Sequence, residues 1–100
     1  MNKVDLFNLI IDKTASICDV SSDDIRGRCR RADVVDARCM AFFTAINDMN
    51  FTYRDISSIL GRNDPSAIRQ LYHTYDSRCT SFCFRKLSAT LRRDIKMLAE

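Results

Sequence analysis

The sequence predicts a compact all-α domain of five or six helices, and three observations lead to this prediction. Apolar side chains recur every three or four residues along most of the 100-residue chain, as on the buried face of a helix. No segment is predicted to form a strand. Two glycines, one proline and 46% hydrophobic residues leave no predicted linker, so we expect residues 1–100 to form a single domain.

The first predicted helix spans about Val4 to Cys18. Its expected buried residues, which lie at helical spacing, are Phe7, Ile10, Ile11 and Cys18. Ser21 and Ser22 then offer caps for a short second helix, which Gly27 ends. A basic loop follows and leads into the next long helix.

A central helix is predicted from about Ala32 to Met49. Its expected core residues are Val35, Cys39, Phe42, Ile46 and Met49. Thr52 caps the helix after it, and Phe51 is expected to pack back against that helix as a hydrophobic staple.

The last helix is predicted at about residues 81–98, after a bend near Ser77 to Ser81. The apolar residues in line along it are Phe84, Leu87, Leu91, Ile95 and Leu98. This stripe either closes the core or pairs with a second copy of itself, and core closure is the more common outcome.

The segment at about residues 52–77 predicts a helix-turn-helix around the turn Gly61-Arg62-Asn63-Asp64-Pro65-Ser66. Gly61 suits the positive φ that ends a helix, Asp64 suits a helix cap, and Pro65 suits a first helical position. The apolar residues of the two helices are Ile56, Ile59 and Leu60 upstream and Ile68, Leu71, Tyr72 and Tyr75 downstream. This pattern turns Ser66, Arg69, Gln70 and His73 outward. An exposed second helix with polar tips suits a DNA major groove.

Positive charge is concentrated in two blocks of the sequence. Residues 25–31 hold four arginines and no acidic residue, and residues 61–100 have a net charge of +4, within a total of +3. Twelve of the sixteen basic residues are arginines, whose planar guanidinium suits phosphate groups and guanine edges better than lysine does. Charge runs are commonly only solvated surface. Here one block lies beside the turn and the other precedes its supporting helix, which favours a DNA-facing role.

Five cysteines, at positions 18, 29, 39, 79 and 83, show no spacing typical of a disulfide framework. We expect reduced thiols, with Cys18, Cys39 and Cys83 at apolar helix positions. An alternative is a zinc site made by Cys79 and Cys83 with His73 or Cys29, but no Cys-x-x-Cys pair occurs. We therefore predict no metal and no other cofactor.

Four motifs occur in an order that matches a known family. Residues 24–31 form an aspartate-led short helix followed by a basic loop, and residues 35–41 open a helix with Arg38 and a following alanine. Asp55-Ile56 then stands where that family has Glu-Ile, and Leu60-Gly61 with Asp64-x-Ser66-x-Ile68 falls within its signature Phe-Gly-Gly-Arg-Asp-His-Thr-Thr-Val. From Leu6 to about Leu98 the chain thus resembles the C-terminal DNA-binding domain of the bacterial replication initiator DnaA, a Trp-repressor-like fold.

The resemblance implies a bipartite grip on duplex DNA. Arg30, with Arg28 close by, corresponds to an arginine that enters the minor groove, and Arg38 to one that meets a phosphate. The start of the second helix of the motif would read bases in the major groove. The candidate DNA-binding residues are Arg28, Arg30, Arg31, Arg38, Arg54, Arg62, Asn63, Asp64, Ser66, Ala67, Arg69 and Gln70.

Three residues depart from the family signature. Asn63 replaces its arginine, Pro65 its histidine and Ala67 its second threonine. We therefore do not expect recognition of the family's usual box. Arg69 suits guanine, Gln70 suits adenine, and Ala67 suits contact with a thymine methyl group.

Other function classes find little support in the sequence. One histidine, no nucleophile–base constellation and no metal set indicate that the protein is not an enzyme. The absence of a Gly-x-x-x-x-Gly-Lys-Ser/Thr loop predicts no nucleotide binding through that motif. No membrane span or signal segment is recognised, so we expect a cytoplasmic protein, and the resemblance implies a bacterial or phage origin.

The expected partner is double-stranded DNA, in a regulatory role in transcription or replication, with a possible homodimer through the C-terminal helix. The alternative is a small protein-interaction module, for example a phage-encoded binder of a host protein. That module would use Leu87, Leu91 and Ile95 or the altered second helix of the motif.

Overall fold

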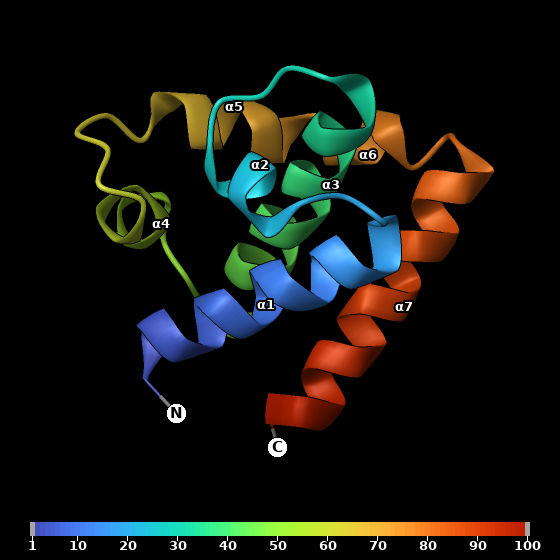
Figure 1. Cartoon of the computed structure of the whole chain (residues 1–100), viewed down its shortest axis with the longest axis horizontal. Helices are drawn as coiled ribbons and strands as arrows, with labels where there is room; N and C mark the ends of the chain where they lie inside the picture. The colour runs from blue at the N-terminus through green and yellow to red at the C-terminus, as the bar shows by residue number, and fades with distance from the viewer. Residues whose placement is uncertain (1, 100) are drawn as a thin grey trace.

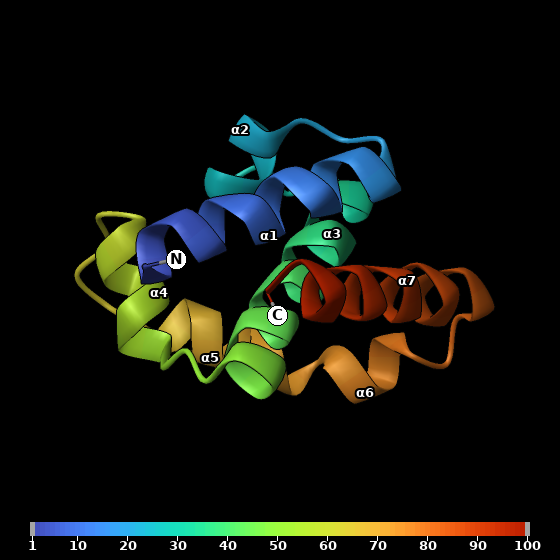
Figure 2. The ribbon, with the colours of Figure 1, turned by 90° about the horizontal axis from the view of Figure 1, so that it is seen from below.

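The central element of the molecule is the helix α3, against which most of the other helices pack, whereas α4 packs against α5 (Figures 1 and 2). The computed structural model describes residues 2–99, and in this range it contains helices and no strand. The elements in chain order are α1 (Lys3–Cys18), α2 (Ser22–Arg26), α3 (Ala32–Phe43), η1 (Thr44–Asp48), α4 (Tyr53–Ile59), α5 (Ser66–His73), α6 (Tyr75–Arg78) and α7 (Phe82–Ala99). Besides the single-turn α6, the described residues form six α-helices, so the predicted all-α globule is confirmed. Its radius of gyration is 12.2 Å, close to the ~13 Å typical of a folded chain of this length.

The helix α1 packs on both α3 and α7 and supplies part of the core. Phe7, Ile10 and Ile11 are fully buried, as predicted, whereas Cys18 is only half-buried. The side chain of Asn2 caps the helix by accepting a hydrogen bond from the Asp5 N–H at 2.8 Å.

The short helix α2 has the predicted cap. The Ser21 hydroxyl accepts hydrogen bonds from the N–H groups of Asp23 and Asp24, and Ile25 is fully buried. Gly27 ends the helix with a φ of −85°, so it is not needed there for a left-handed conformation. A Cβ at Gly27 would come within 3.1 Å of the Asp23 carbonyl oxygen, which favours glycine for a close approach instead.

The predicted helix at residues 32–49 is observed as α3 continued by η1, a π-helical turn. Val34, and not Val35, is buried, because α3 is covered on several sides and its buried surface is wider than one apolar stripe. Thr44, the first residue of η1, donates its hydroxyl to the Met40 carbonyl oxygen at 2.8 Å. Asn50, which has a left-handed φ of 63°, lies just after η1 and ends the continuous helical segment.

The helices α4 and α5 are joined by the turn at residues 60–65. Thr52 and Asp55 form a reciprocal capping box at the start of α4. Gly61 has a φ of 70°, as the turn pattern predicted. The predicted start of α5 is one residue too early, because Pro65 and not Asp64 stands at the cap position and Ser66 is the first helical residue. The Asp64 carboxylate precedes the cap and accepts hydrogen bonds from the Ser66 N–H at 2.9 Å and from the Ser66 hydroxyl at 2.7 Å. Phe51, before the cap, is buried against the ring of Phe7.

The buried face of α5 is narrow. Ile68 is 1% exposed, whereas Leu71 and Tyr72 are half-buried. Tyr75 is buried as predicted, but it begins α6 and stacks on the ring of Phe43. The residues predicted to point outward, Ser66, Arg69, Gln70 and His73, are all exposed.

The helix α7 closes the core. Phe84, Leu91 and Ile95 are buried, so most of the predicted stripe faces the protein itself. Leu98 is an exception at 50% exposed, because it lies in the last turn of α7, where residues 96–99 are all exposed. Within residues 2–99, no helix combines the length and hydrophobicity needed to cross a membrane.

Candidate functional site

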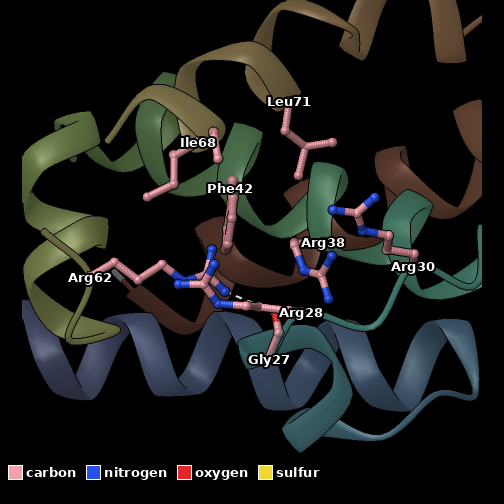
Figure 3. Close-up of a pocket in the computed structure, with 9 residues that line it drawn as sticks. Gly27, Arg28, Arg30, Arg38, Phe42, Arg62, Ile68 and Leu71 are labelled. Carbon is pink, nitrogen blue, oxygen red and sulfur yellow. Dashed lines mark hydrogen bonds between the residues drawn. The ribbon is translucent and has the colours of Figure 1, made fainter. Parts of the chain in front are cut away.

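Two hollows lie between the basic loop that follows α2 and the start of α5, and we call them together the arginine groove (Figure 3). The inner hollow has a volume of about 250 Å³ and the outer one about 360 Å³. The residues that line the inner hollow are Gly27, Arg28, Arg30, Arg38, Phe42, Arg62, Ala67, Ile68 and Leu71. The residues that line the outer hollow are Arg28, Arg62, Asn63, Asp64 and Ala67. The groove therefore joins segments that are far apart in the sequence.

Arg62 connects the two sides of the groove. Its backbone is fixed to α4, because its N–H donates to the Ser57 carbonyl oxygen at 2.8 Å and the Ser57 hydroxyl donates to the Arg62 carbonyl oxygen at 2.6 Å. Its Nη2 then donates to the carbonyl oxygens of Arg26 at 3.0 Å and Gly27 at 2.8 Å. The turn before α5 is thereby attached to the end of α2, where the basic loop begins.

Arg38 lines the inner hollow and is only 8% exposed. Its Nε donates to the Ile25 carbonyl oxygen at 2.8 Å, and its Nη2 donates to the Asp24 carbonyl oxygen at 2.7 Å. These bonds satisfy carbonyl groups in the last turn of α2, which a helix leaves without internal partners. Arg38 thus stabilises α2 and at the same time presents its charge to the groove.

Arg28 and Arg30 are exposed members of the groove. Neither donates a side-chain hydrogen bond within residues 2–99. In Figure 3 the side chain of Arg28 extends toward Arg62, and that of Arg30 lies beyond Arg38 on the other side. Both guanidinium groups are therefore available to a ligand.

The charge of the groove is not neutralised within the described residues. Between residues 2 and 99, the ion pairs within 4.0 Å involve other basic residues, and none includes Arg28, Arg30, Arg38 or Arg62. Burial and the neighbouring Arg62 lower the pKa of Arg38, and burial and the neighbouring Arg28 lower the pKa of Arg62. The arginines therefore repel one another, and an anion would relieve that repulsion.

One acidic residue, Asp64, lines the outer hollow. Hydrogen bonds from the Ser66 side chain and backbone lower the pKa of the Asp64 carboxyl group. Asp64 is therefore ionised at neutral pH, and it places a negative charge at the edge of a basic surface.

The other candidate residues from the sequence lie outside the two hollows. Arg31 forms an exposed ion pair with Asp33 at 2.7 Å, and Arg54 is exposed on α4. Ser66, Arg69 and Gln70 are exposed on α5, and the Arg69 guanidinium lies 5.6 Å from the centre of the Tyr53 ring. The structure thus brings together seven of the twelve candidates. Those seven are Arg28, Arg30, Arg38, Arg62, Asn63, Asp64 and Ala67.

Sequence reasoning did not identify the apolar base of the groove. Phe42, Ile68 and Leu71 line the inner hollow, and helical periodicity marked all three only as core residues. It also missed Gly27 as an acceptor for Arg62, because backbone carbonyl groups leave no signal in a sequence. For the same reason, the sequence did not predict the two hydrogen bonds from Arg38 to the carbonyl oxygens of Asp24 and Ile25.

The cysteines divide between core and surface. Cys39 is buried and Cys18 is half-buried, and burial raises the pKa of each thiol to about 11. The expectation of an apolar position is wrong for Cys83, which is exposed near the start of α7. Within the described part of the chain, no group of three or more His, Cys, Asp or Glu residues is arranged to hold a metal ion.

No model of a known protein family matches this chain, and a search of curated proteins found no relative.

Proposed function

We propose that this protein binds double-stranded DNA through the arginine groove and the exposed face of α5. The observation that supports this most directly is the attachment of Arg62 to the Gly27 carbonyl oxygen, which holds the basic loop next to the start of α5. Duplex DNA is a dense polyanion, and a groove whose four arginines form no internal ion pair within the described residues suits it.

In this proposal α4, the turn and α5 act as a helix-turn-helix similar to that of the DnaA C-terminal domain. The helix α5 enters the major groove with its exposed side. Arg69 and Gln70 then reach guanine and adenine edges, and Asn63, Ser66 and Ala67 contact the DNA at the tip of the helix. The exposure of Ser66, Arg69 and Gln70 supports these roles.

The basic loop provides the second contact. Arg30 enters the adjacent minor groove, whose negative potential attracts arginine, and Arg28 and Arg38 face the sugar-phosphate backbone. Arg31 and Arg54 extend the contact to flanking phosphates. The ion pair between Arg31 and Asp33 does not prevent this, because it is exposed and salt screens such pairs. The proposed biological role is regulation of transcription or replication in the cytoplasm of a bacterium, by a cellular or a phage protein.

Binding to a labelled duplex at a series of salt concentrations tests the proposal. About five phosphate contacts give a slope of about −4.5 in a plot of log affinity against log salt. Absence of binding at low salt would refute the proposed function. Selection from a random duplex library then identifies the preferred site, and a palindromic site would indicate a dimer.

A protein-interaction module is the second candidate, and exposed apolar side chains on α7 support it. Phe82 is 66% exposed and Met97 is 67% exposed, whereas Leu91 and Ile95 are buried in the core and are not accessible to a partner. A partner that stays bound to the protein at high salt and after nuclease treatment would favour this candidate over DNA binding.

A further inference from the structure

We propose that copies of this protein associate with one another, with the outer surface of α7 in one copy docked against the outer surface of α1 in another. The inference goes beyond DNA binding and does not depend on it. Two sets of exposed charges carry it. We call Asp5 and Asp12 on α1 the acidic row, and Lys86 and Arg93 on α7 the basic row.

The acidic row lies on the solvent side of α1. Asp5 and Asp12 are exposed and stand seven positions apart. Seven residues make nearly two helical turns, so both carboxylates project from the same side of the helix, about 10.5 Å apart along its axis. The buried residues of α1 are Phe7, Ile10, Ile11 and Thr14. At 3.6 residues per turn these four point away from the acidic row, which therefore faces water.

The basic row lies on the solvent side of α7 and has the same spacing. Lys86 and Arg93 are exposed and also stand seven positions apart. The buried residues of α7 are Phe84, Ser88, Leu91 and Ile95. These lie about half a turn away from Lys86 and Arg93 around the helix. The two rows thus match in spacing and are opposite in charge.

Both rows remain available to a partner. Between residues 2 and 99, neither Asp5 nor Lys86 takes part in an ion pair. Asp12 and Arg93 each have one internal ion-pair partner, at 3.6 Å and 3.3 Å, but their side chains are 65% and 68% exposed. Exposed ion pairs are weak, so these internal contacts yield readily to a contact between copies.

Exposed apolar side chains mark the same two surfaces. The large hydrophobic residues that are exposed within residues 2–99 are Val4, Phe82, Met97 and Leu98, and all of them lie on α1 or α7. Phe82 precedes Lys86 by four positions, and Met97 follows Arg93 by four, so both extend the basic row along one side of the helix. Contact between the two helices would remove such side chains from water, which favours association.

Charge determines which helix occupies the outer surface of α7. Two copies of α7 placed against each other would bring like charges together, and such contacts are strongly disfavoured. The outer surface of α1 instead offers carboxylates at the spacing of Lys86 and Arg93, so two ion pairs form at once. We therefore assign this surface to α1 of a second copy.

This contact leaves the arginine groove open. In Figure 1, α1 and the C-terminal end of α7 lie along the lower side of the molecule, whereas α5 and the loop after α2 lie along the upper side. Copies that associate in this way keep their grooves accessible, and neighbouring copies can contact the same ligand.

Sedimentation equilibrium of the full chain, freed of nucleic acid, tests the association. At low salt we expect the average mass to rise with protein concentration above the 11.5 kDa of one chain. It should return toward that value at about 1 M salt, where exposed charges are screened. A monomer at every concentration would overturn the inference, as would association that appears only after duplex DNA is added.

Reversal of the basic row makes the assignment specific. The double variant Lys86→Glu with Arg93→Glu should associate at least about tenfold more weakly than the wild type, because like charges then meet across the contact. The matched control, Arg54→Glu with Arg69→Glu, changes the net charge equally on α4 and α5 and should associate like the wild type. An equal loss in both would mean that only net charge matters, and would overturn the inference.

Reversal of the acidic row completes the test. The double variant Asp5→Lys with Asp12→Lys should also be monomeric, and thermal melting establishes that each variant is folded. Mixing this protein with the Lys86→Glu, Arg93→Glu variant should restore association, because opposite charges again face each other at both surfaces. A mixture of folded variants that stays monomeric would contradict the pairing of α1 with α7.

Duplex binding separates this inference from the proposed function. A protein that associates at low salt but binds no duplex would keep the α1–α7 contact and remove the DNA proposal. A protein that binds duplex and is monomeric without it would remove the α1–α7 contact alone.

Discussion

The Arg62 side chain donates a hydrogen bond to the Gly27 carbonyl oxygen at 2.8 Å, across 35 positions of sequence. This contact fixes the loop that follows α2 relative to the turn that precedes α5. Because both segments carry arginines without internal counter-charges, their positive fields add on one surface instead of acting separately. The groove is thus formed by tertiary contacts. We therefore expect some substitutions in and near it to change DNA affinity alone and others to change the stability of the fold.

Arg30→Ala should weaken duplex binding and leave stability nearly unchanged. We expect a loss of about 1 to 3 kcal/mol in binding free energy, the range for an arginine that reads bases. The melting temperature should hardly move, because Arg30 is exposed and makes no internal side-chain bond within residues 2–99. Fluorescence anisotropy with a labelled duplex measures the first effect, and Arg85→Ala is the matched control. Equal affinities for both variants would rule out the proposed minor-groove contact.

Ile68→Ala should destabilise the fold. Ile68 is 1% exposed and anchors α5 to the core, and deletion of a buried aliphatic side chain costs about 2 to 5 kcal/mol. Denaturant unfolding measures the free-energy change. Gln70→Ala, on the exposed side of the same helix, should stay within about 0.5 kcal/mol of the wild type. A stable Ile68→Ala variant would show that α5 is held mainly by other contacts.

Asp64→Asn should tighten duplex binding at low salt. The side-chain oxygen of asparagine can accept the same hydrogen bonds from Ser66, so the start of α5 is retained while one negative charge leaves the outer hollow. We expect the gain in affinity to fade as salt is added, because salt screens the interaction between exposed charges. Parallel salt titrations of the two proteins provide the measurement. Weaker binding of the variant would instead indicate that Asp64 accepts a hydrogen bond from a DNA base.

Asp48→Asn should reduce the acid sensitivity of the fold. Burial raises the pKa of Asp48, but hydrogen bonds from Arg92 and Asn47 outweigh it and bring the pKa below the ordinary value of 3.8. A depressed folded-state pKa adds stability that is present above pH 3.8 and is lost as the pH falls through the folded-state value. The variant should lose about 1 to 3 kcal/mol at pH 7 and show a flatter decline below about pH 4. Unfolding curves between pH 2 and 7 measure both effects, and equal pH profiles would contradict the assigned role of the Asp48–Arg92 pair.

Gly61→Ala should destabilise the protein through the backbone alone. Apart from the neighbouring residues of the chain, no atom of residues 2–99 lies within 4 Å of a Cβ added there, but the φ of 70° is unfavourable for alanine by about 1 to 2 kcal/mol. Gly61→Asn should cost less, because asparagine tolerates the left-handed conformation better. Thermal unfolding of the two variants tests this order, and the reverse order would mean that the turn rearranges.

Local signals in the sequence predicted local structure well. The Gly61 conformation and the Thr52 cap each depend on neighbouring residues, and both are observed. The start of α5 was predicted one residue too early, since Pro65 and not Asp64 stands at its cap position. The errors arose where packing decides. The core contains Val34 instead of the predicted Val35, and Leu98 is exposed instead of buried. Helical periodicity identifies an apolar stripe, but it does not tell how many neighbouring elements cover that stripe.

By itself, the sequence determined the all-α class, the turns that separate the helices and the two blocks of positive charge. Each of these follows from residue type and spacing along the chain. Only the tertiary structure decided that Arg28, Arg30, Arg38 and Arg62 share one groove and that Arg38 is bound to the end of α2. The physical reason is that the side-chain bonds of Arg38 and Arg62 end on backbone carbonyl oxygens. Every residue has such an oxygen, so the sequence cannot indicate which of them a distant guanidinium will reach.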